Sequence, residues 1–190
     1  TETYLIMMNL FKIFKSKNDI IRIENFYNNI VILARNKNLY IEGGVPDTLD
    51  GRFELIILHC HLFVKRLLEA GLEEKKFAQE IIDYMFKDFD RSLREIGVGD
   101  LSVGKKIKFM VSSYYGRANT YQNALIKRGK TIDDALKKNL YGTNTPNEIQ
   151  IQYIKVYINN LIKYLASLKN EEILICFQSK VNPIKGINNE

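Results

Sequence analysis

The sequence has no tryptophan, three prolines and only two cysteines among its 190 residues. Cys60 and Cys176 cannot form the multi-bridge framework that stabilises many small secreted domains, so the composition favours a reducing compartment. The longest strongly apolar run, residues 55–64, is about half as long as a membrane-spanning helix and contains both histidines. The sequence therefore predicts neither a disulfide scaffold nor a transmembrane helix.

Strand patterns are also missing. No stretch sustains an alternation of apolar and polar residues between turn residues, whereas apolar residues recur every three or four positions along most of the chain. The hydrophobic content of 46% and the charged content of 26% are those of an ordinary globular protein. We predict one compact all-α domain over residues 19–178. An N-terminal extension with a basic amphipathic arm (1–18) precedes it, and a polar, disordered tail (179–190) follows.

A long helical hairpin is predicted at the centre of the chain. Its first helix covers about Glu73–Ile96 and its second about Ser102–Arg128, with Gly97 as a left-handed cap between them. Asp100 and Ser102 are both candidate N-caps of the second helix. The stripe expected to face inward on that helix comprises Val103, Ile107, Met110, Val111, Tyr114, Ala118, Tyr121 and Leu125.

Other helices are predicted on either side of the hairpin. The first covers 19–37. The next, capped by Asp47 or Asp50 and ending at Gly71, is apolar around nearly its whole circumference and is therefore expected at the centre of the domain. After the hairpin we expect a short helix opened by 131–134, a long helix capped by Thr145, and a last short helix over 171–178.

Two motifs suggest chemistry, and their context argues against each. Residues 99–106 resemble a phosphate-binding loop, but Lys106 stands where the magnesium-binding Ser or Thr belongs, and a helix precedes the segment instead of a strand. His59 and His61 are two residues apart, so on a helix their rings point about 200° apart and cannot share a metal ion. No serine or cysteine lies in a nucleophile motif. We predict no metal, no cofactor and no catalytic site.

The formal net charge of +6 permits an acidic partner, RNA or an anionic membrane. Lys105, Lys106 and Lys108 follow closely on the predicted start of a helix, where the macrodipole disfavours cations. Either they are solvated lysines near the carboxylates of the turn, or they bind something acidic.

Basic and apolar residues also mix in 10–17, a segment that either lies on an anionic membrane or docks on its own domain. Residues 1–7 are expected to be an extension, with Met8 as a plausible start.

Three segments, in the same order, resemble the ubiquinol–cytochrome c chaperone family: VPDTLDGRFELIILH (45–59), FKDFDRSLREIGVGDLSVGKK (86–106) and YGR (115–117). The resemblance is strong over about residues 45–140. It implies a non-enzymatic assembly factor of the cytochrome bc1 complex that binds newly made cytochrome b, works beside a small partner protein and binds near the ribosomal tunnel exit. No obvious presequence is present, so we expect a bacterial member at the cytoplasmic side of the inner membrane.

A physical mechanism for that role needs exposed basic and aromatic side chains that meet acidic loops or lipid headgroups. Tyr114 and Tyr115 cannot both face inward, because adjacent helical residues point about 100° apart. Arg52 either contacts the client or pairs with a carboxylate such as Glu54. The candidate binding residues are Arg52, Arg91, Arg94, Asp100, Lys105, Lys106, Lys108, Tyr114, Tyr115 and Arg117.

Two other function classes stay open. The basic charge also suits an RNA- or ribosome-binding helical module, although no known RNA-binding motif is present. DNA is not expected as a partner. A catalytic function is supported only by the motifs that were rejected above.

Overall fold

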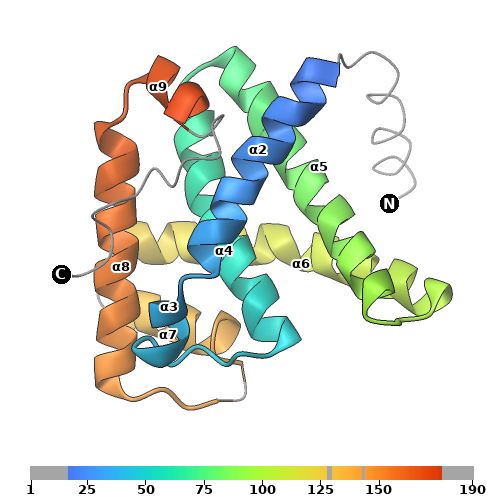
Figure 1. The fold of residues 1–190 in the computed structure, drawn as a ribbon. Coiled ribbons are helices and arrows are strands. Elements are labelled where there is room, and N and C mark those ends of the chain that lie inside the picture. Colours follow the sequence, from blue (N-terminus) through green and yellow to red (C-terminus); the bar gives the residue numbers. More distant parts are fainter. Residues whose placement is uncertain (1–16, 128–129, 143, 177–190) are drawn as a thin grey trace.

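The computed structural model describes residues 17–127, 130–142 and 144–176, and every regular element in these ranges is a helix (Figure 1). The predicted all-α class is therefore confirmed. The helices are α2 (Lys17–Ala34), α3 (Lys37–Ile41), α4 (Leu49–Leu68), α5 (Leu72–Glu95), α6 (Asp100–Lys127), α7 (Lys130–Asn139), α8 (Glu148–Ser167) and α9 (Asn170–Cys176).

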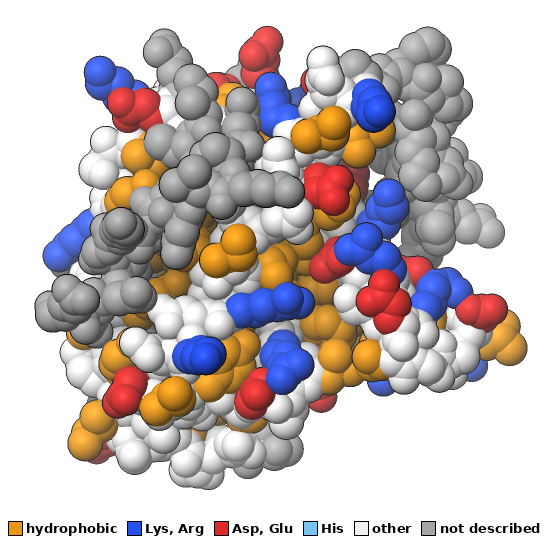
Figure 2. All heavy atoms as spheres, in the orientation of Figure 1, with side chains coloured by type: hydrophobic (Ala, Val, Ile, Leu, Met, Phe, Trp, Pro, Cys, Tyr) orange, Lys and Arg blue, Asp and Glu red, His pale blue; other side chains and the backbone are white. Residues whose placement is uncertain are grey.

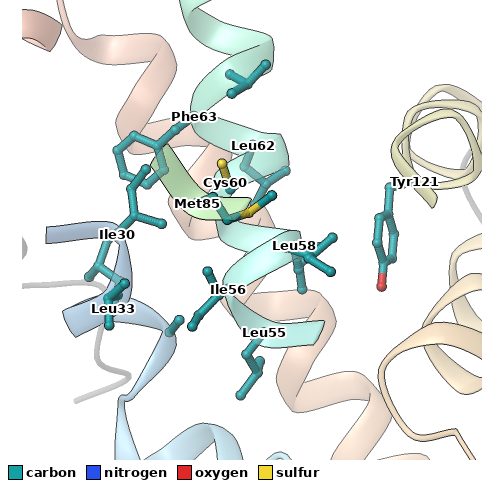
Figure 3. Close-up of a cluster of buried hydrophobic side chains, with 14 of the residues drawn as sticks. Ile30, Leu33, Leu55, Ile56, Leu58, Cys60, Leu62, Phe63, Met85 and Tyr121 are labelled. Carbon is teal, nitrogen blue, oxygen red and sulfur yellow. The ribbon is translucent and has the colours of Figure 1, made fainter. Parts of the chain in front are cut away.

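Helix α4 lies at the centre, as its all-round apolar sequence predicted. It packs against α2, α5, α6 and α8, and it buries residues on every side. Figure 3 shows α4 side chains such as Ile56, Leu58 and Leu62 pointing in different directions toward these neighbours. Phe26 of α2 meets Phe63 of α4 edge to face, with 5.8 Å between ring centroids. Such burial on all sides is what stabilises an apolar helix in water.

The caps of two helices differ from the prediction. Helix α4 is capped by Thr48, whose hydroxyl accepts from the Gly51 N–H at 3.1 Å, and not by Asp47 or Asp50. Helix α8 is capped by Asn147, and not by Thr145, in a reciprocal capping box with Gln150. In both places several capping residues stand close together, and only the residue directly before the first helical one can bond the free N–H groups.

The N-terminal helix also ends earlier than predicted, at Ala34 and not near Lys37. A short helix that we did not predict, α3, follows it. The Asn36 side chain caps α3 by accepting from the Asn38 N–H at 3.1 Å. A helix this short is too brief for apolar periodicity to be visible in the sequence.

The turn between α5 and α6 confirms the predicted glycine cap. Gly97 has φ of 87°, a left-handed conformation. The Val98 N–H bonds the Leu93 carbonyl at 3.0 Å and the Gly97 N–H bonds the Arg94 carbonyl at 2.9 Å, which together form a Schellman motif. The second helix begins at Asp100, two residues before Ser102. Beyond the turn, α6 leaves α5, crosses behind α4 in Figure 1 and reaches α7.

No helix within the described ranges is long and apolar enough to cross a bilayer. Residues 1–7 and the predicted tail (179–190) lie outside the described residues. The predicted basic arm also lies outside them, except for residues 17 and 18.

Candidate partner-binding surface

Six of the ten candidate residues lie on the two helix ends that flank the α5–α6 turn, and we call this set the turn surface: Arg91, Arg94, Asp100, Lys105, Lys106 and Lys108. Basic, acidic and apolar side chains stand close together where this turn projects, at the lower right of Figure 2.

Ion pairs fix the α5 side of the turn surface. Arg91 contacts Asp88 at 2.5 Å. Arg94 contacts Asp90 at 2.6 Å and also pairs with Asp100, the first residue of α6. Both arginines are exposed, so each pair contributes little to stability. Arg91 also lies 3.9 Å from Glu95, so two arginines hold the four carboxylates of the turn, and the lysines of α6 carry further positive charge outside these pairs.

Lys105, Lys106 and Lys108 are all exposed, and none of them forms an ion pair within the part of the chain that the structure describes. Because α6 begins at Asp100, all three lie beyond its first turn, where the effect of the macrodipole has largely decayed. The predicted conflict between these lysines and the helix N-terminus is therefore weaker than the sequence indicated. Their side chains are free to meet an anionic partner.

Sequence reasoning overlooked exposed apolar residues beside the lysines. These are Leu101, which is 87% exposed, and Phe109, which is 66% exposed; Tyr115, already a candidate, is 50% exposed. The signal was available, since Leu101 and Phe109 fall outside the inward stripe that begins at Val103. Isolated exposed apolar residues are normal. A group of them among lysines on one helix is a candidate contact surface.

Tyr114 and Tyr115 lie on different sides of α6, as the geometry of a helix predicted. Tyr114 is buried and meets Phe86 of α5 edge to face, with 5.7 Å between ring centroids. Tyr115 lies outside, with its ring 5.3 Å from that of Tyr114. Tyr114 therefore holds α6 on α5, and of the pair only Tyr115 presents its ring to a partner in this conformation.

Two arginines of the candidate set lie away from the turn. Arg52 pairs with Asp47 at 2.6 Å, and not with Glu54. Glu54 instead pairs with Arg117 at 2.9 Å, with side-chain exposures of only 11% and 23% respectively. Burial raises the pKa of Glu54 to about 7, while the Arg117 charge acts in the opposite direction. The Glu54–Arg117 pair thus ties α6 to α4 and presents little charge to a partner.

The two histidines of α4 are core residues. His59 has Nδ1 2.7 Å from the Leu55 carbonyl and Nε2 2.7 Å from the Tyr157 hydroxyl. Since a carbonyl only accepts, Nδ1 carries the proton and Nε2 accepts from the tyrosine. Burial lowers the pKa of both His59 and His61 to about 4. The described residues contain no group of three or more acidic, His or Cys side chains that could hold a metal ion.

Comparisons with known proteins find relatives that are named as assembly factors. Ubiquinol-cytochrome c reductase complex assembly factor 1 of Mus musculus is 20% identical over 158 residues, which cover 83% of this chain and 54% of that protein. The factor of the same name from Homo sapiens is also 20% identical, with 53% of it covered. The chain thus spans about half the length of these curated relatives.

A solved structure is similar along almost the whole chain. The crystal structure of the Cbp3 homolog from Brucella abortus matches with a TM-score of 0.74 and 32% identity, covering 88% of this chain and 92% of that one. The family model described as ubiquinol-cytochrome C chaperone matches residues 42–175, which include α4 to α8 and the turn surface. The chain belongs to the ubiquinol–cytochrome c chaperone family.

Proposed function

We propose that the chain is a non-enzymatic assembly chaperone that binds newly made cytochrome b and promotes assembly of the bc1 complex at the cytoplasmic face of a bacterial inner membrane. The observation that carries the proposal is family membership over residues 42–175, together with relatives that are named as assembly factors of ubiquinol–cytochrome c reductase.

The turn surface supports this role physically. Its lysines stand exposed beside uncovered apolar and aromatic side chains, a combination that suits a membrane-protein client with apolar spans and charged loops. Charge complementarity of this kind mainly speeds association and selects partners. We assign client contact to Arg91, Arg94, Asp100, Lys105, Lys106, Lys108 and Tyr115, with Arg52 as a peripheral contact on α4.

The test is the triple change of Lys105, Lys106 and Lys108 to Gln in cells that depend on this chain for their bc1 complex. We expect less cytochrome b to co-purify with the variant and less bc1 complex to assemble. Folding should be unchanged, because the lysines are exposed and lie beyond the first turn of α6. The matched control removes the same charge from exposed lysines elsewhere, Lys75, Lys76 and Lys163.

Normal assembly by the Lys105/Lys106/Lys108 variant would move the client site away from the turn surface. Crosslinking in a membrane-containing lysate tests the function itself: cytochrome b should be among the attached proteins, and its absence would contradict the proposal. The same experiment reports on the ribosome and on a small partner protein, which the family resemblance implies.

The exposed lysines favour one alternative, an RNA- or ribosome-binding module. In that case RNA affinity of the purified chain would fall steeply with salt, by about 0.7 in log affinity per phosphate contact for each tenfold rise in salt. No RNA binding at low salt would exclude it.

A further inference from the structure

Helix α6 carries an apolar and basic stripe on its outer side that no described element covers. We define this outer stripe as Leu101, Lys105, Lys108, Phe109 and Tyr115, all of them exposed. At 100° per residue these five positions fall within an arc of about 120°, and they extend along about 21 Å of the helix. We propose that the outer stripe lies in the headgroup region of an anionic lipid membrane. The outer stripe shares Lys105, Lys108 and Tyr115 with the proposed client surface, and the vesicle experiment below measures lipid binding in the absence of the client.

The rotation of α6 about its own axis is fixed by its inner side. Val103, Tyr114 and Tyr121 are buried on that side, so the outer stripe cannot turn inward to cover its apolar residues. The polar group of Ser112, which lies among the stripe residues, is already satisfied, because its hydroxyl donates to the Phe109 carbonyl at 2.8 Å. The stripe thus offers apolar rings and chains without an unmet hydrogen-bonding group between them.

The charge of α6 suits an anionic surface. Asp100 is the sole carboxylate in the sequence of α6, and Arg94 pairs with it. Lys105, Lys106 and Lys108 are exposed and unpaired in the described structure. Lysine side chains reach from among apolar residues to lipid phosphates, and leucine and phenylalanine beside them enter the acyl boundary. This is the composition of an interfacial helix.

The shape of the region also suits a flat membrane surface. An apolar peptide segment binds in a groove that surrounds it. Two hollows lie away from the stripe, one at the start of α2 and one between α7 and α8. The α5–α6 turn instead projects from the body of the molecule in Figure 1. A projecting helix end can lie against the flat boundary of a bilayer.

The experiment measures flotation of the full chain with vesicles of phosphatidylcholine alone or mixed with phosphatidylglycerol. We expect binding to the mixed vesicles and much weaker binding to the neutral ones. Leu101→Gln with Phe109→Gln should lower the partition coefficient at least tenfold, because apolar area is withdrawn from the membrane while helix propensity is kept at about the same level. Changing Lys105, Lys106 and Lys108 to Gln should lower it roughly 100-fold at low salt.

Matched controls separate this surface from the rest of the molecule. Ile149→Gln removes an equally exposed apolar residue from α8, and changing Lys75, Lys76 and Lys163 to Gln removes equal charge elsewhere; both variants should bind nearly as the parent does. Unaltered helical circular dichroism shows that each variant folds. A chain lacking residues 10–17 should retain the sensitivity to Leu101→Gln with Phe109→Gln.

Three results would overturn the proposal. The first is a parent chain that does not bind mixed vesicles. The second is a Leu101→Gln, Phe109→Gln variant that binds them as the parent does, including the case in which only loss of 10–17 abolishes binding. The third is a variant that keeps vesicle binding but loses cytochrome b, which would make the stripe a polypeptide-binding surface.

Discussion

Helices α4 and α6 both carry apolar residues outside a single stripe, but those of α4 are buried and those of α6 are exposed. Helix α4 is enclosed by α2, α5, α6 and α8, so its all-round apolar sequence is accounted for by packing. The first half of α6 packs on one side only, and Leu101 and Phe109 face outward. Apolar residues that packing explains say little about function, whereas a group that packing leaves exposed among lysines is a candidate contact surface.

The largest expected effect is acid sensitivity centred on α4. The pKa of His59 and His61 is about 4 in the fold against an ordinary 6.5, so between these values the unfolded chain binds more protons. Stability from each histidine is complete above about pH 6.5 and falls as the pH drops toward 4, by roughly 3 kcal/mol each. Glu54, with its pKa raised to about 7, acts in the opposite direction between about pH 7 and 4.5.

Urea unfolding at a series of pH values measures this loss. His59→Leu should lower stability at pH 7, because the Tyr157 hydroxyl loses its acceptor, and should flatten the decline with acid. A parent chain as stable at pH 4 as at pH 7 would show that α4 is not the dry core described here.

The next prediction concerns the ion pair between Glu54 of α4 and Arg117 of α6. Arg117→Leu leaves the Glu54 carboxylate of α4 without its partner from α6. We expect a loss of about 2 kcal/mol, below the roughly 3–5 of a fully buried pair, because Glu54 can take up a proton. Adding Glu54→Gln should restore part of the loss. Urea unfolding of both single variants and the double variant gives the coupling, and a coupling of zero would contradict the role of the pair.

Gly51 of α4 should not tolerate replacement by a larger residue. A Cβ added at Gly51 would lie 2.1 Å from the Pro46 carbonyl oxygen, so the loop before α4 would have to move. Gly51→Ala should therefore cost about 1–3 kcal/mol in the free energy of unfolding, as overpacking does. A melting temperature equal to that of the parent would mean that this loop adapts without strain.

The smallest expected effect is a gain in stability, and it concerns Gly116 of α6. A Cβ at Gly116 would meet nothing within 4 Å, and the residue is helical and exposed. Gly116→Ala should raise the free energy of unfolding by about 0.5–1 kcal/mol, because alanine loses less conformational freedom in a helix. If Gly116→Ala were as harmful as Gly51→Ala, the outer side of α6 would be covered by something that the described residues do not include.

Local patterns in the sequence predicted much of this molecule. The spacing of Val103, Ile107 and Met110 placed the inner side of α6, and Gly97 marked the turn by its unique access to positive φ. The all-round apolar run after residue 52 predicted the central helix. These features are encoded within a few residues, because helix periodicity and cap conformation depend on near neighbours.

Other features depended on how the helices cross. The choice of Thr48 over Asp47 followed from where α4 begins, and Asp47 was then left to pair with Arg52. His59 meets Tyr157, a residue 98 positions away, and Glu54 meets Arg117 between α4 and α6. No local pattern contains such pairs. The inward stripe of α6 already placed Leu101 and Phe109 on its outer side, but only the tertiary structure decided that no described helix covers that side.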